Sequence, residues 1–151
     1  MVDIKKVNPK RIILFGHSLG CSVTAYLMNY ILENKKEKSN IMIIQNPFEN
    51  IKKVSLEHVP FFGNYVVSKL KTDKYIKNID RLSNNLNICI IHAKYDEIIN
   101  YNHSVNLSKY LINNKPRLFI IYGTHERIKY NESIFNHISN INKICNKIHI
   151  D

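Results

Sequence analysis

The stretch FGHSLG, residues 15–20, places one serine between two glycines, directly after the apolar run RIILF and before a segment of helical period. A sharp strand-to-helix turn at Ser18 would lift its hydroxyl clear of the backbone, where a base could reach it. Such a turn crowds the positions two residues before and after the serine, and Gly16 and Gly20 carry no β-carbon to clash there. The pattern G-x-S-x-G therefore predicts a nucleophile elbow, with the backbone N–H of Leu19 aimed at a tetrahedral oxyanion. The alternative is a glycine-flanked turn in which the serine only caps a helix.

Short apolar runs alternate with segments of helical period along the rest of the chain. This alternation predicts an α/β fold with βα units and a mostly parallel sheet flanked by helices. We expect strands at 11–15, 41–44, 88–92 and 117–122, and helices at 19–33, at about 102–111 and from about Asn131 onward. No repeat or low-complexity linker divides the 151 residues, so we expect a single domain over 1–151.

The first predicted helix has four large apolar residues on one face: Val23, Leu27, Tyr30 and Ile31. A long connection, residues 46–87, follows the second predicted strand, and we expect one or two helices within it.

An elbow of this kind predicts an acid and then a histidine, each just past the C-terminal end of a later strand. Asp96 follows the third predicted strand in the run HAKYDEII, and His125 follows the fourth in the run YGTHE. His125 would serve as general base and then general acid, while Asp96 would fix its tautomer and stabilise its imidazolium. Asp96 could instead cap a helix or turn, Glu97 is an adjacent candidate for the acid, and His125 could be an ordinary loop residue. Because three residue types occur in the expected order, we predict a triad of Ser18, Asp96 and His125.

The charge balance and the histidine spacing argue against several other classes of function. The chain has 22 basic and 12 acidic residues, a net charge of +10. The lysines are spread along the chain without interleaved aromatic residues, which favours a solvated basic surface over nucleic-acid binding and leaves weak contact with an anionic membrane open. No pair of histidines or cysteines has the spacing of zinc ligands, so we expect neither a metal nor another cofactor.

Three widely spaced cysteines, Cys21, Cys89 and Cys145, lie in apolar surroundings, which predicts reduced core residues of an intracellular protein. The first ten residues, MVDIKKVNPK, lack the apolar region of a secretory leader, and no run approaches the length of a transmembrane helix. We expect a cytoplasmic protein, with membrane association through a segment outside this sequence left open.

The stretches GHSLG (16–20), QNPFENI (45–51), HAKYDEII (92–99) and YGTHE (122–126) together resemble the α/β-hydrolase fold. Within that fold the chain looks most like the Bem-like branch, which includes hydrolases that remove palmitate from cysteines. The resemblance implies a serine hydrolase that cleaves esters or thioesters of lipid-like acyl groups through an acyl-enzyme.

The same resemblance places a lid-like insertion over residues 46–87. Five of its residues either line an acyl pocket or form ordinary core, and both interpretations stay open. The residues predicted to bind substrate are Phe61, Phe62 and Tyr65, accompanied by Val59 and Val66.

In the α/β-hydrolase fold the elbow follows the fifth strand, whereas here it follows the first strand that the sequence predicts. The resemblance thus implies that the N-terminal strands are absent from this sequence, together with the loop that supplies a second oxyanion donor. One missing donor costs about 3 kcal/mol of transition-state stabilisation. We therefore expect a missing N-terminal part or a partner strand beside residues 11–15. The alternative function is a truncated, catalytically weak hydrolase remnant that acts as an interaction module.

Overall fold

The computed structural model describes residues 12–34, 41–61 and 70–147, with side chains up to residue 140. The strands are β1 (Ile13–His17), β2 (Ile41–Gln45), β3 (Asn87–Ala93) and β4 (Arg117–Ile121). The helices are α1 (Leu19–Glu33), α2 (Ile51–His58), α3 (Thr72–Leu82), α4 (Asn102–Lys109) and α5 (Glu132–Lys147).

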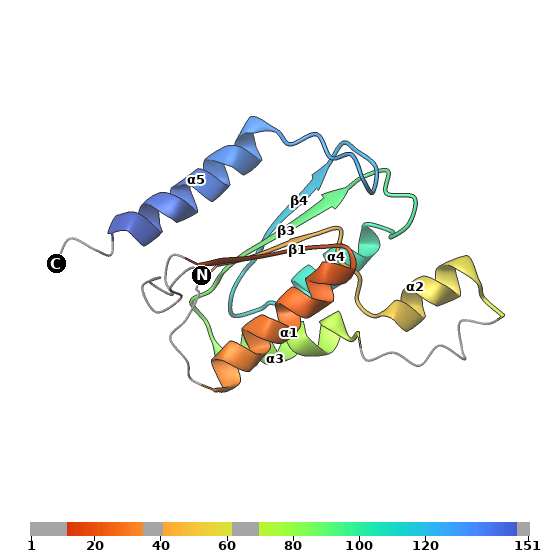
Figure 1. Ribbon diagram of the computed structural model, residues 1–151, viewed down its shortest axis with the longest axis horizontal. Coiled ribbons are helices and arrows are strands. Elements are labelled where there is room, and N and C mark those ends of the chain that lie inside the picture. Colours follow the sequence, from red (N-terminus) through yellow and green to blue (C-terminus); the bar gives the residue numbers. More distant parts are fainter. Residues whose placement is uncertain (1–11, 35–40, 62–69, 148–151) are drawn as a thin grey trace, which may run out of the picture.

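The four described strands form one parallel sheet in the order β1-β2-β3-β4. Helices α1, α3 and α4 pack on one face of this sheet, and α5 packs on the other (Figure 1). The predicted parallel sheet flanked by helices is thereby confirmed. Because the strands are parallel, their C-terminal ends meet along one edge of the sheet, where the segments after β1, β3 and β4 lie.

The two central strands are buried on both faces, which explains their uninterrupted apolar sequences. Along β2, Met42 and Ile44 face one layer of helices while Ile41 and Ile43 face the other. The first cluster includes Met28, Met42, Ile76, Ile90 and Leu107. The second includes Ile43, Cys89, Ile91, Ile121 and Ile134.

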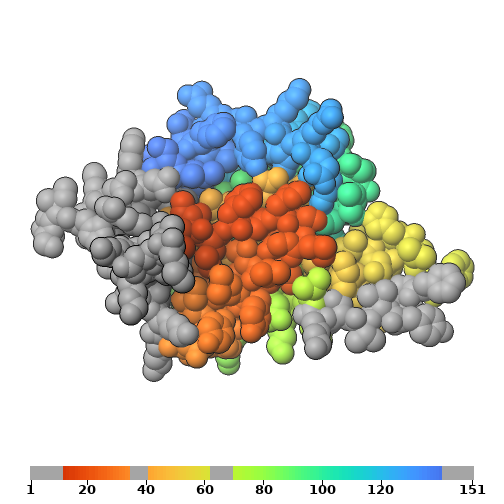
Figure 2. All heavy atoms as spheres, viewed as in Figure 1, coloured from red at the N-terminus to blue at the C-terminus, as the bar shows by residue number. Residues whose placement is uncertain are grey.

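Helix α1 has the predicted bounds, but its large apolar face does not pack on the sheet. Val23 and Leu27 are 59% and 42% exposed, and Figure 2 shows α1, red to orange, open to solvent on the face in view. The apolar residues that α1 buries are Cys21, Ala25, Met28 and Leu32. The helix begins only two residues after the end of β1, and in its first two turns it buries small residues, among them Cys21 and Ala25. Farther along, the larger Met28 and Leu32 are also buried, so α1 packs on the sheet through a different apolar face from the one predicted.

The described part of the connection between β2 and β3 contains two helices, where one or two were predicted. The side chain of Asn50 caps α2 by accepting a hydrogen bond from the backbone N–H of Lys53 at 3.0 Å. Helix α3 packs against α1 and contributes Ile76 and Ile79 to the core. The remaining boundaries agree within one or two residues, except that Arg11 lies outside the described residues.

Candidate active site

Ser18 makes the turn from strand to helix in a single residue. Its backbone has φ 51° and ψ −120°, a left-handed conformation that residues other than glycine rarely adopt. Its N–H donates to the carbonyl of Gln45 at 3.0 Å, and its own carbonyl accepts from the N–H of Cys21 at 3.0 Å. Strain of this kind persists only where surrounding contacts enforce it, and it is concentrated at functional sites.

The two glycines of the elbow are not equivalent. A β-carbon on Gly16 would lie 2.5 Å from Thr24 Oγ1 and 2.6 Å from the carbonyl oxygen of Gly20, so this position requires glycine. A β-carbon on Gly20 would meet nothing within 4 Å. The expectation that Gly20 is needed for its missing β-carbon is therefore wrong, because the close approach involves its backbone and not a side-chain position.

The structure brings together the three residues predicted as a triad. His125 Nε2 lies 3.0 Å from Ser18 Oγ, and His125 Nδ1 lies 2.7 Å from Asp96 Oδ2. The three residues follow β1, β3 and β4, and so converge at the C-terminal edge of the sheet. Because an ionised carboxylate only accepts hydrogen bonds, the neutral imidazole carries its proton on Nδ1 and presents the lone pair of Nε2 to the serine hydroxyl.

The Asp96 carboxylate is fully buried and held by four groups. Its Oδ1 accepts from the backbone N–H of Ile98 at 2.9 Å and of Ile99 at 2.7 Å. Burial by itself would raise the pKa of this carboxyl, but the contacts of His92, Ile99, His125 and Ile98 outweigh it and lower the pKa to about 2. Asp96 is therefore ionised at neutral pH.

Glu97, the other candidate for the acid, has a different contact. Its Oε2 accepts from the backbone N–H of His125 at 3.2 Å and not from the ring. Of the two neighbouring acids, Asp96 is thus the one that contacts the imidazole, while Glu97 helps to hold the main chain of the histidine.

His92, near the end of β3, is a second histidine that contacts the Asp96 carboxylate. It is completely buried, with Nδ1 2.6 Å from Ser104 Oγ and Nε2 2.9 Å from the carbonyl oxygen of Ile99. The same Nε2 lies 3.5 Å from Asp96 Oδ2. A carbonyl oxygen can only accept, so Nε2 is the protonated nitrogen, and Ser104 can donate to Nδ1.

A tight turn after β4 carries His125. The N–H of Thr124 donates to the carbonyl of Arg127 at 2.9 Å, and Gly123 adopts φ 150°. A β-carbon on Gly123 would lie 2.4 Å from that same carbonyl oxygen. The turn also rests on two side chains from elsewhere, because the His125 carbonyl accepts from Asn46 Nδ2 at 2.9 Å and lies 3.3 Å from His17 Nε2.

Sequence reasoning missed Asn46 as a functional candidate. The sequence shows only that Asn46 comes directly after a buried strand, between Gln45 and Pro47, and this position alone does not distinguish a buried hydrogen-bonding residue from an exposed one.

For the other predicted site residues, the predicted role is not tested or the residue lies outside the described part of the chain. Leu19 is the first residue of α1, next to the serine, and its role as an oxyanion donor stays a prediction. Phe61 is 89% exposed, and Phe62, Tyr65 and Val66 lie outside the described residues, so the acyl pocket also stays a prediction.

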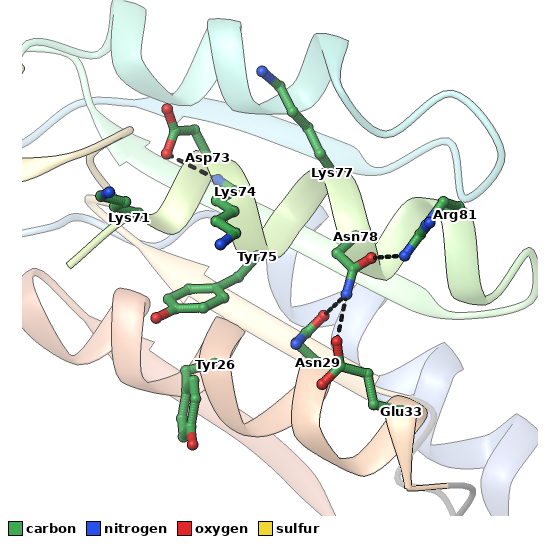
Figure 3. Close-up of a pocket in the computed structure, with 10 residues that line it drawn as sticks. All are labelled: Tyr26, Asn29, Glu33, Lys71, Asp73, Lys74, Tyr75, Lys77, Asn78 and Arg81. Atoms are coloured by element: carbon green, nitrogen blue, oxygen red, sulfur yellow. Dashed lines mark hydrogen bonds between the residues drawn. The ribbon is translucent and has the colours of Figure 1, made fainter. Parts of the chain in front are cut away.

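A cavity of about 790 Å³ lies between α1 and α3, and none of the three triad residues lines it. Its walls include Tyr26 and Tyr75, whose rings meet edge to face at 5.4 Å (Figure 3). At one end, Asn78 Nδ2 donates to Asn29 Oδ1 at 2.6 Å and to Glu33 Oε1 at 2.8 Å. These bonds join the two helices, so the cavity belongs to the contact between α1 and α3 and is separate from the candidate active site.

Two cysteines have described side chains, and both are buried free thiols, Cys21 and Cys89. Burial raises the pKa of both, to about 12 for Cys89, so neither is a ready thiolate nucleophile. The side chain of Cys145 lies outside the described part of the chain.

Across the described ranges, no group of three or more His, Cys, Asp or Glu side chains is arranged to hold a metal ion. In the same ranges, no helix combines the length and the apolar character that crossing a membrane requires.

Comparison with known proteins gives relatives of greater length. The chain is 25% identical over 122 residues to uncharacterized protein YfhR of Escherichia coli, a match that covers 81% of this chain and 40% of YfhR. The chain thus spans about 40% of the length of the curated relatives that it matches first.

Among solved structures, the chain is similar to the Pyrococcus furiosus esterase PF2001, with a TM-score of 0.60 and 15% identity over 91% of this chain and 54% of the esterase. It is also similar to the Pyrococcus horikoshii acylaminoacyl peptidase, with a TM-score of 0.57 and 15% identity over 80% of this chain and 21% of the peptidase. Both likenesses concern the fold, which is of the α/β-hydrolase type predicted. Residues 1–133 match the prolyl oligopeptidase family, Peptidase_S9, and the chain therefore belongs to that family.

Proposed function

We propose that this chain carries the nucleophile, base and acid of a serine hydrolase that cleaves carboxylic esters or thioesters. The observation that carries the proposal is the hydrogen-bonded chain from Ser18 through His125 to Asp96, built on a strained serine at a strand-to-helix turn. A serine that merely capped α1 would need neither that backbone conformation nor a histidine at 3.0 Å, and its side chain makes no capping bond.

In the proposed reaction, His125 Nε2 takes the proton of Ser18 as its Oγ attacks the substrate carbonyl. The imidazolium is stabilised by the Asp96 carboxylate, and the oxyanion is stabilised by the N–H of Leu19. His125 then gives the proton to the departing alcohol or thiol, which leaves an acyl-enzyme on Ser18. Water, deprotonated by the same nitrogen, attacks that ester, and the serine regains its proton as the carboxylic acid leaves.

Esters and thioesters are proposed first because they are the substrates that the Bem-like resemblance implies, and because the similar Pyrococcus furiosus protein is an esterase. Hydrolysis of peptide bonds is the second candidate, favoured by the match to the prolyl oligopeptidase family. Acyl thioesters, p-nitrophenyl esters and peptide p-nitroanilides, assayed side by side, distinguish these classes. Phe61, Phe62 and Tyr65 are proposed to contact the acyl group.

Full activity is proposed to need a further part of the fold. β1 lies at one end of the described sheet, and the chain spans about 40% of its first relatives. Additional strands, from the same polypeptide or a partner, would supply the second oxyanion donor. The alternative, a weakly catalytic remnant that serves as an interaction module, draws on the same two observations.

The test is labelling of the purified chain with a fluorophosphonate probe, which reacts with activated serines. We expect labelling that is lost in Ser18→Ala and in His125→Ala but kept in Ser133→Ala, a control at an exposed serine in the first turn of α5. A folded chain that takes no label contradicts the proposal for this chain alone and favours the remnant. Label that persists in Ser18→Ala contradicts the assignment of the nucleophile.

A further inference from the structure

Asn46 occupies an unusual place, directly after β2 at the edge of the sheet where the triad lies. It is completely buried, and its backbone adopts φ 49°, in the left-handed region. Its N–H donates to the carbonyl of Ile91 at 2.8 Å, which continues the pairing of β2 with β3. Asparagine and aspartate adopt this conformation more readily than other residues with a side chain.

Both ends of the Asn46 side chain make hydrogen bonds with fixed direction. Oδ1 accepts from the N–H of Ala93 at 2.9 Å, and Nδ2 donates to the carbonyl of His125 at 2.9 Å. A backbone N–H can only donate and a carbonyl can only accept, so the orientation of the amide follows from its two partners. One buried side chain thus joins the end of β3 to the turn that carries the histidine.

We propose that Asn46 is a positioning residue for His125, an inference that rests on the proposed serine-hydrolase function. The hydrogen bond from Asn46 Nδ2 fixes the position of the His125 main chain, so that the ring can contact both Asp96 and Ser18. His17 Nε2 approaches the same carbonyl at 3.3 Å, a longer contact from a half-buried side chain. The shorter, fully buried bond from Asn46 therefore carries most of this support.

The side chain has a close structural substitute that removes only the donor. Asn46→Asp keeps the size, the tolerance of φ 49° and an oxygen to accept from Ala93. At neutral pH it places a carboxylate oxygen against the carbonyl of His125, where a donor is required. When the buried carboxyl binds a proton it becomes a donor again, and burial raises the pKa at which this happens.

The experiment compares Asn46→Asp with the wild-type chain by rate of fluorophosphonate labelling and by ester hydrolysis over a pH series. At about pH 8 we expect the variant to be slower by about tenfold to a hundredfold, because misplacement of a catalytic group by about 1 Å has effects of that size. The ratio of variant to wild-type rate should rise as the pH falls toward about 5.5, since protonation restores the donor. Taking the ratio cancels the titration of the rest of the site.

Two further variants separate this inference from a general loss of stability. Asn46→Gly tolerates the backbone conformation but has no side chain, so its rate should be low with no recovery at acidic pH. Asn85→Asp adds the same charge at an exposed loop and should behave as wild type. A pH-independent ratio for Asn46→Asp, or a normal rate per folded molecule, overturns the inference.

A readout that needs no turnover separates failure of this inference from failure of the proposed function. The ring nitrogens of ¹⁵N-labelled histidines report the bond between His125 Nδ1 and Asp96 by NMR. We expect the His125 signals to shift in Asn46→Asp at neutral pH. If the wild-type chain is inert, the proposed function fails, and unchanged His125 signals in the variant would overturn the positioning role as well. If the wild-type chain is active but the signals and rates do not change, only the positioning role fails.

Discussion

The glycines on either side of Ser18 differ in what an added methyl group would meet. At Gly16 it would overlap Thr24 Oγ1 and the backbone of Gly20, both within 2.6 Å, whereas at Gly20 it would enter open space. We expect Gly16→Ala to destabilise the fold by about 1–3 kcal/mol or more, since overpacking forces the helix away from the strand. Gly20→Ala should be neutral or stabilising by up to about 1 kcal/mol, because alanine favours a helix over glycine. Urea unfolding of the two variants measures the difference. Equal changes in the free energy of unfolding would contradict the finding that only Gly16 is tightly packed.

The buried Asp96 carboxylate links the site to the pH dependence of stability. Its pKa in the folded chain, about 2, lies below the ordinary value of 3.8, so its ionised form stabilises the fold above about pH 4. This contribution is lost as the pH falls through the folded pKa. We expect Asp96→Asn to be less stable than wild type at neutral pH, by an amount that shrinks between about pH 4 and pH 2. Thermal unfolding across that range checks the prediction, and a gap that does not narrow as the pH falls would show that Asp96 is not held as an anion.

At the level of helices and strands, the sequence allowed the order and approximate bounds to be predicted because the signals are local. Strands β2 and β3 are short apolar runs buried on both faces, and glycine and serine mark the start of α1. The buried face of α1 could not be predicted in the same way. Two faces of α1 have apolar residues at helical spacing, one with Val23 and Leu27 and one with Ala25 and Met28. The spacing does not distinguish them, and the packed fold buries the second.

In the candidate site, too, some residues could be predicted from local sequence signals and others could not. Ser18, Asp96 and His125 could be predicted because each follows a strand that the sequence reveals, and parallel strands bring their C-terminal ends together. Asn46 and His92 could not, because their importance depends on which backbone groups face them. A polar residue at a strand end has no pattern that distinguishes a bond to His125 from a bond to solvent.

At the scale of the whole molecule, the described residues of β1 and α1 form an uncharged, partly apolar segment at one end of the described sheet. Residues 12–32 contain no lysine, arginine, aspartate or glutamate, in a chain whose net charge is +10. Phe15, Leu19 and Val23 from this segment are each more than half exposed. Exposed apolar surface of this kind beside a strand at the end of a sheet promotes association.

We therefore expect the isolated chain to associate with increasing concentration, through β1 and α1. Val23→Lys, on the outer face of α1, should reduce this association without altering the site, because the side chain is exposed. Lys52→Ala, at an exposed position on α2, is a control for a change of charge elsewhere. Light scattering or analytical ultracentrifugation gives the measurement, and a wild-type chain that stays monomeric at high concentration would contradict the expectation.

The sequence distance between the proposed nucleophile and its base has a consequence for how the protein comes to be made. Ser18 and His125 are 107 residues apart and meet only when β1 and β4 belong to the same sheet. A ribosome that adds about 5–20 residues per second needs roughly 5–20 s to pass from one to the other. During that interval the emerging serine has no base. Reactivity of Ser18 toward a probe would therefore report when β4 joins the sheet on a growing polypeptide, and we expect no reaction with the probe before that step.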